Sequence, residues 1–163
     1  MKTVTSNILL SLVLATSSVC VMSRADEQAG AIDPVRTVYR SDREAFIKQN
    51  LPLTEKESAD FWPLYREYRA EMDKLGDELV KLVLEYKDVY PDIPDKEAQR
   101  LLKQYISLDK DHGAKQAHYF KKAGKILPAA KALRWAQLEN RMDLTLRLQL
   151  ASVVPVAPAI PAK

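Results

Sequence analysis

Glycine and cysteine are scarce in this chain, and their scarcity excludes several classes of site. Four glycines occur in 163 residues, at Gly30, Gly76, Gly113 and Gly124, and they form no Gly-rich phosphate-binding loop. Cys20 is the only cysteine, so the chain can form no internal disulfide. No segment alternates between apolar and polar residues as a half-buried strand does. We therefore expect neither a nucleotide loop nor a disulfide framework nor a β-rich fold.

Histidine is also rare, because His112 and His118 are the only two. They are six residues apart, about 240° around a helix, so they would not share a face. Asp109 or Asp111 could assist His112, but such spacing is common by chance. No serine has a histidine at helical spacing. We expect no catalytic residue, no cofactor and no metal site, so the chain is not predicted to be an enzyme; weak metal binding at His112 or His118 stays open.

The first 25 residues have the pattern of a secretory signal peptide. Lys2 provides a positive start, residues 8–22 are mostly apolar, and Ser23-Arg24-Ala25 places small residues before a cleavage point at Asp26. The alternatives are a membrane anchor, for which about 15 apolar residues are too few, and a lipoprotein attached at Cys20, whose preceding residues fit a lipobox poorly. We predict cleavage, a periplasmic location and no stable membrane insertion afterwards.

Cleavage would change the charge of the chain. The full sequence has a net charge of +3, and removal of Lys2 and Arg24, with no acidic residue in the segment, leaves +1. A chain this close to neutrality gives no reason to expect nucleic-acid binding. The mature chain would contain no cysteine at all.

Helical periodicity dominates the rest of the sequence. Apolar residues step by four and three from Phe61 to Tyr86, which predicts a helix from about Thr54 to about Val89, roughly 50 Å long. Thr54 and Glu57 form a Thr-x-x-Glu capping box at its start. Further helices are expected over 35–49, from about 95, and after Pro128.

These elements predict an all-α fold of about four helices arranged as long antiparallel hairpins. We expect a flexible N-terminus over 26–34, one helical domain over 35–151, and a disordered Pro/Ala-rich tail over 152–163, which could instead lie extended on a groove.

The apolar stripe of the long helix allows two interpretations. Its members Tyr65, Tyr68, Met72, Leu79 and Tyr86 either pack in a core or helix seam, or remain exposed as a surface for other chains. Tyr and Met suit the second role, since they combine apolar area with a polar or flexible part. The sequence does not decide between a dimer seam and a client surface.

A basic segment follows the predicted third helix. No acidic residue occurs between Asp111 and Glu139, and this window contains Lys121, Lys122 and Lys125 among aromatic residues. In an exported protein such a segment could contact acidic or unfolded proteins, an anionic lipid surface or an acidic partner domain. The alternative is an ordinary solvated turn between two helices.

The chain resembles the Spy/CpxP-like group of bacterial periplasmic proteins, which carry a Leu-Thr-x-x-Gln motif. Leu53-Thr54-Glu55-Lys56-Glu57 lies where that group has its first motif, with Glu57 in place of the Gln. Residues 61–65 and 126–139 are similar to a branch of the group, although the second segment lacks Leu-Thr. The resemblance covers about residues 51–150.

The resemblance implies a helical hairpin fold that commonly dimerises as an antiparallel cradle. It also implies an ATP-independent chaperone or envelope-stress adaptor that binds unfolded or envelope proteins. The alternatives within the group are a regulatory subunit that docks on the periplasmic domain of a sensor kinase, and a metal-responsive protein, although the histidine-rich signature of the latter is absent here. By analogy, Tyr65, Tyr68, Met72, Leu79, Tyr86, Lys121, Lys122 and Lys125 would form the partner-binding surface.

Overall fold

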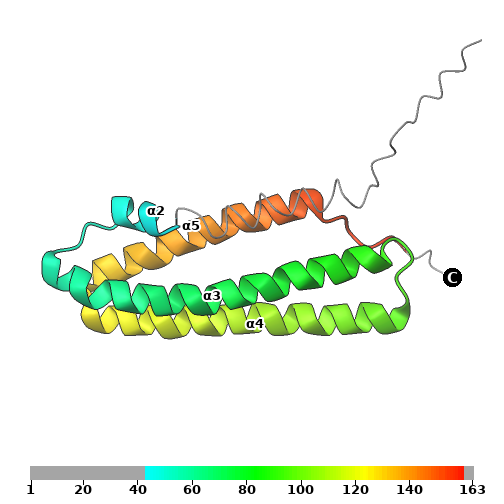
Figure 1. Ribbon diagram of the computed structural model, residues 1–163, viewed down its shortest axis with the longest axis horizontal. Helices are drawn as coiled ribbons and strands as arrows, with labels where there is room; N and C mark the ends of the chain where they lie inside the picture. The colour runs from blue at the N-terminus through cyan, green and yellow to red at the C-terminus, as the bar shows by residue number, and fades with distance from the viewer. Residues whose placement is uncertain (1–42, 160–163) are drawn as a thin grey trace, which may run out of the picture.

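The computed structural model describes residues 43–159, and this part of the chain is all-helical. A short helix, α2 (Arg43–Asn50), precedes three long ones: α3 (Glu55–Val89), α4 (Asp95–Ile126) and α5 (Ala129–Val153) (Figure 1). No strand occurs between residues 43 and 159, so the all-α prediction is confirmed. The predicted signal peptide, the N-terminus over 26–34 and the first part of the helix predicted over 35–49 lie outside the described residues.

The start of α3 is fixed by the predicted capping box. The Thr54 amide donates to Glu57 Oε2 over 2.7 Å, and the Glu57 amide donates to Thr54 Oγ1 over 3.3 Å. The Glu57 carboxylate also accepts from Lys131 of α5. Lys131 is the main reason that the pKa of Glu57 lies below its usual value. The cap therefore pairs backbone amides that the start of α3 would otherwise leave free, and it also links α3 to α5.

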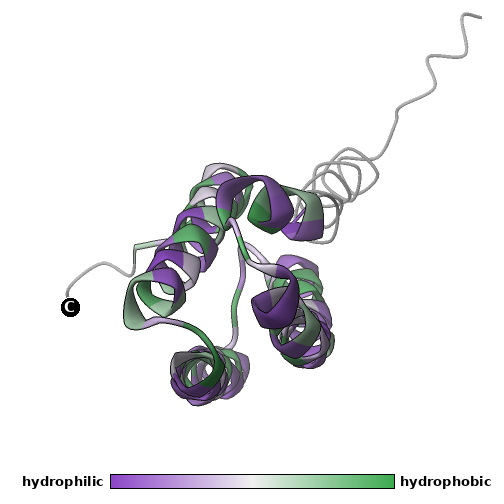
Figure 2. Cartoon of the chain, turned by 90° about the vertical axis from the view of Figure 1, so that its left-hand side faces the viewer, coloured by the Kyte–Doolittle hydropathy of each residue, from purple (hydrophilic) through white to green (hydrophobic). Residues whose placement is uncertain are grey.

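The α3 and α4 helices form a long antiparallel hairpin joined by residues 90–94. The α5 helix returns along α4, and α2 packs on α5. Viewed along its long axis, the molecule has its long helices around a shared interior rather than in one layer (Figure 2). The α5 helix ends at Val153, two residues beyond the predicted helical domain.

One half of the bundle is tightly packed. This packed half comprises α2, residues 55–72 of α3, residues 115–126 of α4 and residues 129–142 of α5, with the cap and turn residues next to them. Its centre is Trp135, whose ring makes edge-to-face contacts with Phe61, Tyr68 and Phe120 at centroid distances of 4.9–5.3 Å. Such pairs add about 0.5–1.5 kcal/mol each beyond the area that they bury. Ile47 of α2 completes this core.

The other half is open. This open half comprises residues 75–89 of α3, residues 90–112, which include the start of α4, and residues 143–159. The described part of α2, which begins at Arg43, lies beside the first part of α5 (Figure 1). Its inward side chains are mainly leucines, among them Leu75, Leu82, Leu101 and Leu146. Among residues 43–159, three helices surround this half, and their side chains leave an interior space.

Candidate protein-binding groove

An apolar groove of about 650 Å³ runs through the open half between α3, α4 and α5. This volume falls within the ~300–1,000 Å³ typical of ligand sites in proteins. The walls are formed by side chains at helical spacing from all three long helices. Among the apolar residues that line it are Leu75, Leu79, Leu82, Tyr86, Leu101, Leu102, Tyr105, Leu108, Leu146 and Leu150.

The inner end of the groove is polar, and its charges are paired. Arg147 Nη2 contacts Asp109 Oδ1 at 3.0 Å, which joins α5 to α4. His112 Nε2 lies 3.5 Å from Asp143 Oδ2. Both pairs border the groove, and Asp143 also pairs with Arg43 of α2. The groove therefore has mainly apolar walls, and its charged residues gather at the inner end.

The outer end of the groove is crossed by the residues that follow α5. Val154 and Ala157 contribute to the lining, and the Tyr86 hydroxyl donates to the Pro155 carbonyl oxygen over 2.9 Å. We call residues 154–159 the strap. Because one exposed hydrogen bond contributes only about 0.5–1.5 kcal/mol, the strap is held weakly.

A buried polar cluster separates the groove from the packed half. Glu139, which is 0% exposed, accepts from Arg43 Nη1 at 3.0 Å and from the Tyr68 hydroxyl and Trp135 Nε1, both at 3.3 Å. Asp143 accepts from Arg43 Nη2 at 2.8 Å. Together with Gln116, which donates to Asp143, these residues connect all four helices.

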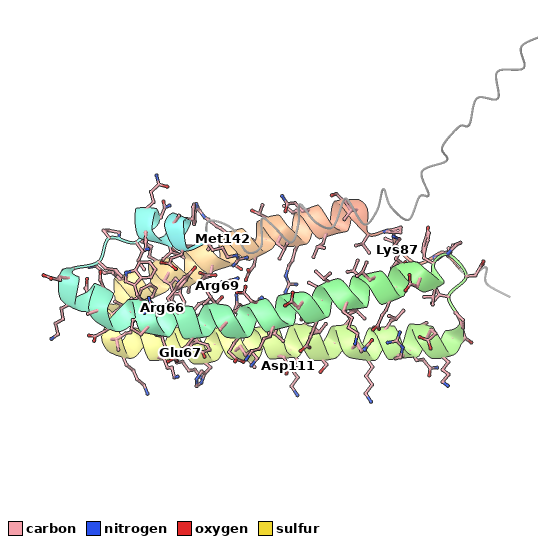
Figure 3. The ribbon with its side chains drawn as sticks, in the orientation of Figure 1. Arg66, Glu67, Arg69, Lys87, Asp111 and Met142 are labelled. Carbon is pink, nitrogen blue, oxygen red and sulfur yellow. The ribbon has the colours of Figure 1, made fainter. Side chains whose placement is uncertain are left out.

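Burial and charge shift the acidity of two groups in this region. Burial raises the pKa of Glu139, and the cations Arg43 and Arg69 oppose the shift. Figure 3 shows Arg69 and Met142 in the space between α3 and α5. Burial also lowers the pKa of His112, against the attraction of Asp143. His112 is therefore neutral near pH 7, and its imidazole can still hydrogen bond to the Asp143 carboxylate.

The structure corrects the surface role predicted for three residues of the stripe. Tyr65 and Tyr68 are 0% exposed and Met72 is 1% exposed, so none of them can touch a partner of the folded chain. The α4 and α5 helices and α2 cover them, and burial raises the pKa of both tyrosine hydroxyls. For these residues the core interpretation is the correct one.

The remaining predicted surface residues lie at opposite ends of the molecule. Leu79 and Tyr86 line the groove in the open half. Lys121, Lys122 and Lys125 are exposed near the end of α4, in the packed half. Lys121 follows His112 by nine residues, roughly 14 Å along the helix axis. The basic segment and the apolar groove are therefore separate surfaces.

The predicted motif residues and the histidines have structural partners. Leu53 packs against the core, and Thr54 and Glu57 form the helix cap. His118 is exposed and packs edge-to-face on Tyr119 at 5.2 Å, whereas His112 faces Asp143. Within residues 43–159 no three His, Cys, Asp or Glu side chains gather as a metal site would require. In the same range no helix has the length and apolar character needed to span a membrane.

Neither the groove nor the buried cluster was predicted from the sequence. One signal was present: Glu139 and Asp143 follow Trp135 at intervals of four, so charged residues interrupt an apolar helix face. Charges at such positions must be paired when buried. Nothing in the sequence names Arg43, which is 96 residues from Glu139, as the partner.

Comparisons with known protein families, with curated proteins and with solved structures found no match to this chain. The resemblance to Spy/CpxP-like proteins at residues 53–57 therefore stays a prediction.

Proposed function

We propose that this chain is an exported, ATP-independent adaptor or chaperone-like protein that binds apolar segments of other proteins in the groove. The observation that carries this proposal is the apolar groove of about 650 Å³ in the open half. Apolar side chains that a fold leaves uncovered typically mark a binding surface. The predicted signal peptide supports a role outside the cytoplasm, where nucleotide is not available.

The exposed apolar residues at the rim of the groove support the same function. Leu102 is 59% exposed and Tyr105 is 53% exposed, and both line the groove from α4. In the isolated chain these exposed side chains, next to the buried Leu101, add no stability by burial, whereas a partner that covers them would bury their apolar area. Burial of apolar area on a partner yields roughly 25 cal/mol per Å² before the costs of association.

The test is suppression of aggregation by the mature protein. Reduced insulin is a suitable client, since the reductant acts on insulin and the mature chain, residues 26–163, contains no cysteine. We expect stoichiometric protein to slow the rise in light scattering without nucleotide. The double variant Leu102→Glu/Tyr105→Glu should abolish this effect, because two carboxylates at the rim oppose entry of apolar segments.

A matched control exists on the same molecule. Ile106 and Leu133 are 57% and 61% exposed and lie outside the groove lining. The variant Ile106→Glu/Leu133→Glu adds the same charge at the same exposure and should keep full activity. If both double variants behave alike, or if wild-type protein leaves aggregation unchanged in excess, the proposal is wrong.

The basic segment supplies a second variant that distinguishes two surfaces. Charge reversal at Lys121, Lys122 and Lys125 should weaken client capture modestly and only at low salt, since exposed charges act over a screened range. If this variant loses all activity while the groove variants keep theirs, clients bind at the end of α4 and not in the groove. Crosslinking in cells would also tell a broad set of clients from one sensor-kinase partner.

A further inference from the structure

We infer that the outward face of α5, together with a row of lysines on α4, docks the protein on an anionic lipid surface. This face is separate from the groove, and the inference does not depend on the proposed function. It commits to peripheral attachment, in which α5 lies parallel to the lipid surface and no helix crosses the bilayer.

Three leucines form a stripe along the outside of α5. Leu133, Leu144 and Leu148 are 61%, 51% and 72% exposed, and none of them lines the groove. At 100° per residue they fall within about 60° of one another around the helix. The buried side chains of Trp135 and Leu146 lie on the opposite side of α5. Aligned apolar residues of this exposure, unlike scattered ones, mark a contact surface.

The charges beside this leucine stripe are of one sign. Every exposed charged residue of α5 is an arginine, and both acidic residues of this helix are buried. Arg147 is paired with Asp109 of α4. Arg134 and Arg141 therefore contribute positive charge that no acidic residue of α5 balances at the surface.

A row of lysines continues this positive charge on α4. Lys103, Lys110 and Lys121 are all exposed. Their spacings of seven and eleven residues return each one to the same side of the helix within about 20°. This side lies opposite Leu101 and Tyr119, which are buried. Since α4 and α5 lie side by side, one flat surface can touch the leucine stripe and the lysine row together.

An anionic bilayer matches this combination of side chains better than a folded protein does. Leucines enter the boundary between headgroups and acyl chains, while the long arginine and lysine side chains keep their charges among the lipid phosphates. Protein interfaces instead draw most of their affinity from Trp, Tyr and Arg anchors in pockets, where leucine is under-represented. A mature chain with a net charge of only +1 also needs cations gathered on one face to bind an anionic membrane.

The test is sedimentation of the mature protein with vesicles of phosphatidylglycerol and phosphatidylcholine in equal parts. We expect binding to these vesicles and none to phosphatidylcholine alone. Leu144→Ser/Leu148→Ser keeps the charge of the protein and should weaken binding at least about tenfold, because less apolar area enters the bilayer. The matched control is Leu102→Ser/Tyr105→Ser at the rim of the groove, which should bind as the wild-type protein does.

A pair of charge variants tests the cations of this face. Lys110→Gln/Arg141→Gln should weaken vesicle binding at low salt, since two cations no longer meet the lipid phosphates. Lys74→Gln/Lys81→Gln removes the same charge from α3, where these lysines are 70% and 77% exposed. This control should weaken binding less.

Each other outcome overturns the inference. Binding that survives Leu144→Ser/Leu148→Ser, or that both charge variants weaken equally, would reflect only general attraction of cations to the vesicles. Absence of vesicle binding with capture of poly-glutamate would assign the face to an acidic protein. Absence of vesicle binding with a dimer that Leu144→Ser/Leu148→Ser dissociates would assign it to a second copy of the chain. The insulin assay contains no lipid, so its result bears on the groove alone.

Discussion

The packed half and the open half are built from the same three long helices, yet they differ in what fills their interior. In the packed half, α2 and the rings of Phe61, Tyr68 and Trp135 occupy the space between α3, α4 and α5. In the open half leucines line that space, and within residues 43–159 no fourth helix fills it. The boundary is the cluster of Arg43, Glu139 and Asp143.

The contrast shows how one bundle can be both stable and able to bind. Stability requires a well-packed core, whereas binding requires apolar surface that the fold has not used. Separating the two along the helix axis lets the packed half hold the helices in register while the open half remains accessible. Mutations should therefore have different consequences in the two halves.

The largest expected effect on stability is Trp135→Ala in the packed half. It removes a fully buried indole that contacts four other aromatic rings, and should cost about 3–5 kcal/mol of the free energy of unfolding. Leu82→Ala in the open half should cost less, about 1–2 kcal/mol, because the groove already adjoins the vacated space. Urea unfolding followed by circular dichroism measures both. Equal losses would contradict the division of the bundle into two halves.

Removal of Arg43 tests the boundary between the halves. Arg43→Met leaves Glu139 and Asp143 buried without their cation, and should destabilise the fold by about 3 kcal/mol. Adding Glu139→Gln and Asp143→Asn to this variant should recover part of the loss, since the uncompensated charges disappear. If the triple variant is no more stable than Arg43→Met, the cluster does not act through charge pairing.

The pH dependence of stability should reflect two titratable groups at this boundary, His112 and Glu139. The pKa of His112 is lower in the folded chain, so the unfolded chain binds more protons and stability falls as the pH drops below about 6.5. The pKa of Glu139 is raised, so this residue makes stability fall as the pH rises above its unfolded value of 4.5. His112→Gln should flatten the decline between pH 7.5 and 5.5. An unchanged slope in urea titrations would exclude His112 as its cause.

The smallest expected effect is Tyr86→Phe, which removes the hydrogen bond to the strap. Global stability should change by less than about 1 kcal/mol, because the bond is exposed. Limited proteolysis after residue 153 should become faster, and reduced insulin should associate faster with a less covered groove. No change in either rate would show that the strap does not restrict access.

Periodicity and capping chemistry were enough to predict much of the fold. The Thr54–Glu57 box marks the start of α3, and the break before Asp95 marks the turn of the hairpin, because both depend on local backbone chemistry. The site was harder to predict from the sequence. A stripe such as Tyr65 to Tyr86 looks uniform in sequence, and only tertiary packing buries its first part and exposes its last.

The long-range elements of the site could not be predicted in this way. The pairing of Arg43 with Glu139 depends on where α2 docks, and helical periodicity carries no information about that position. The groove likewise depends on how α3, α4 and α5 pack around it, and helical periodicity does not specify that packing.

The most direct test of the two-part bundle is amide hydrogen exchange of the mature protein with and without reduced insulin as the client. We predict added protection over residues 79–86, 98–108 and 146–153, which border the groove, and unchanged exchange over residues 61–72 and 119–139. Protection concentrated around Lys121–Lys125, or spread evenly over both halves, would contradict it.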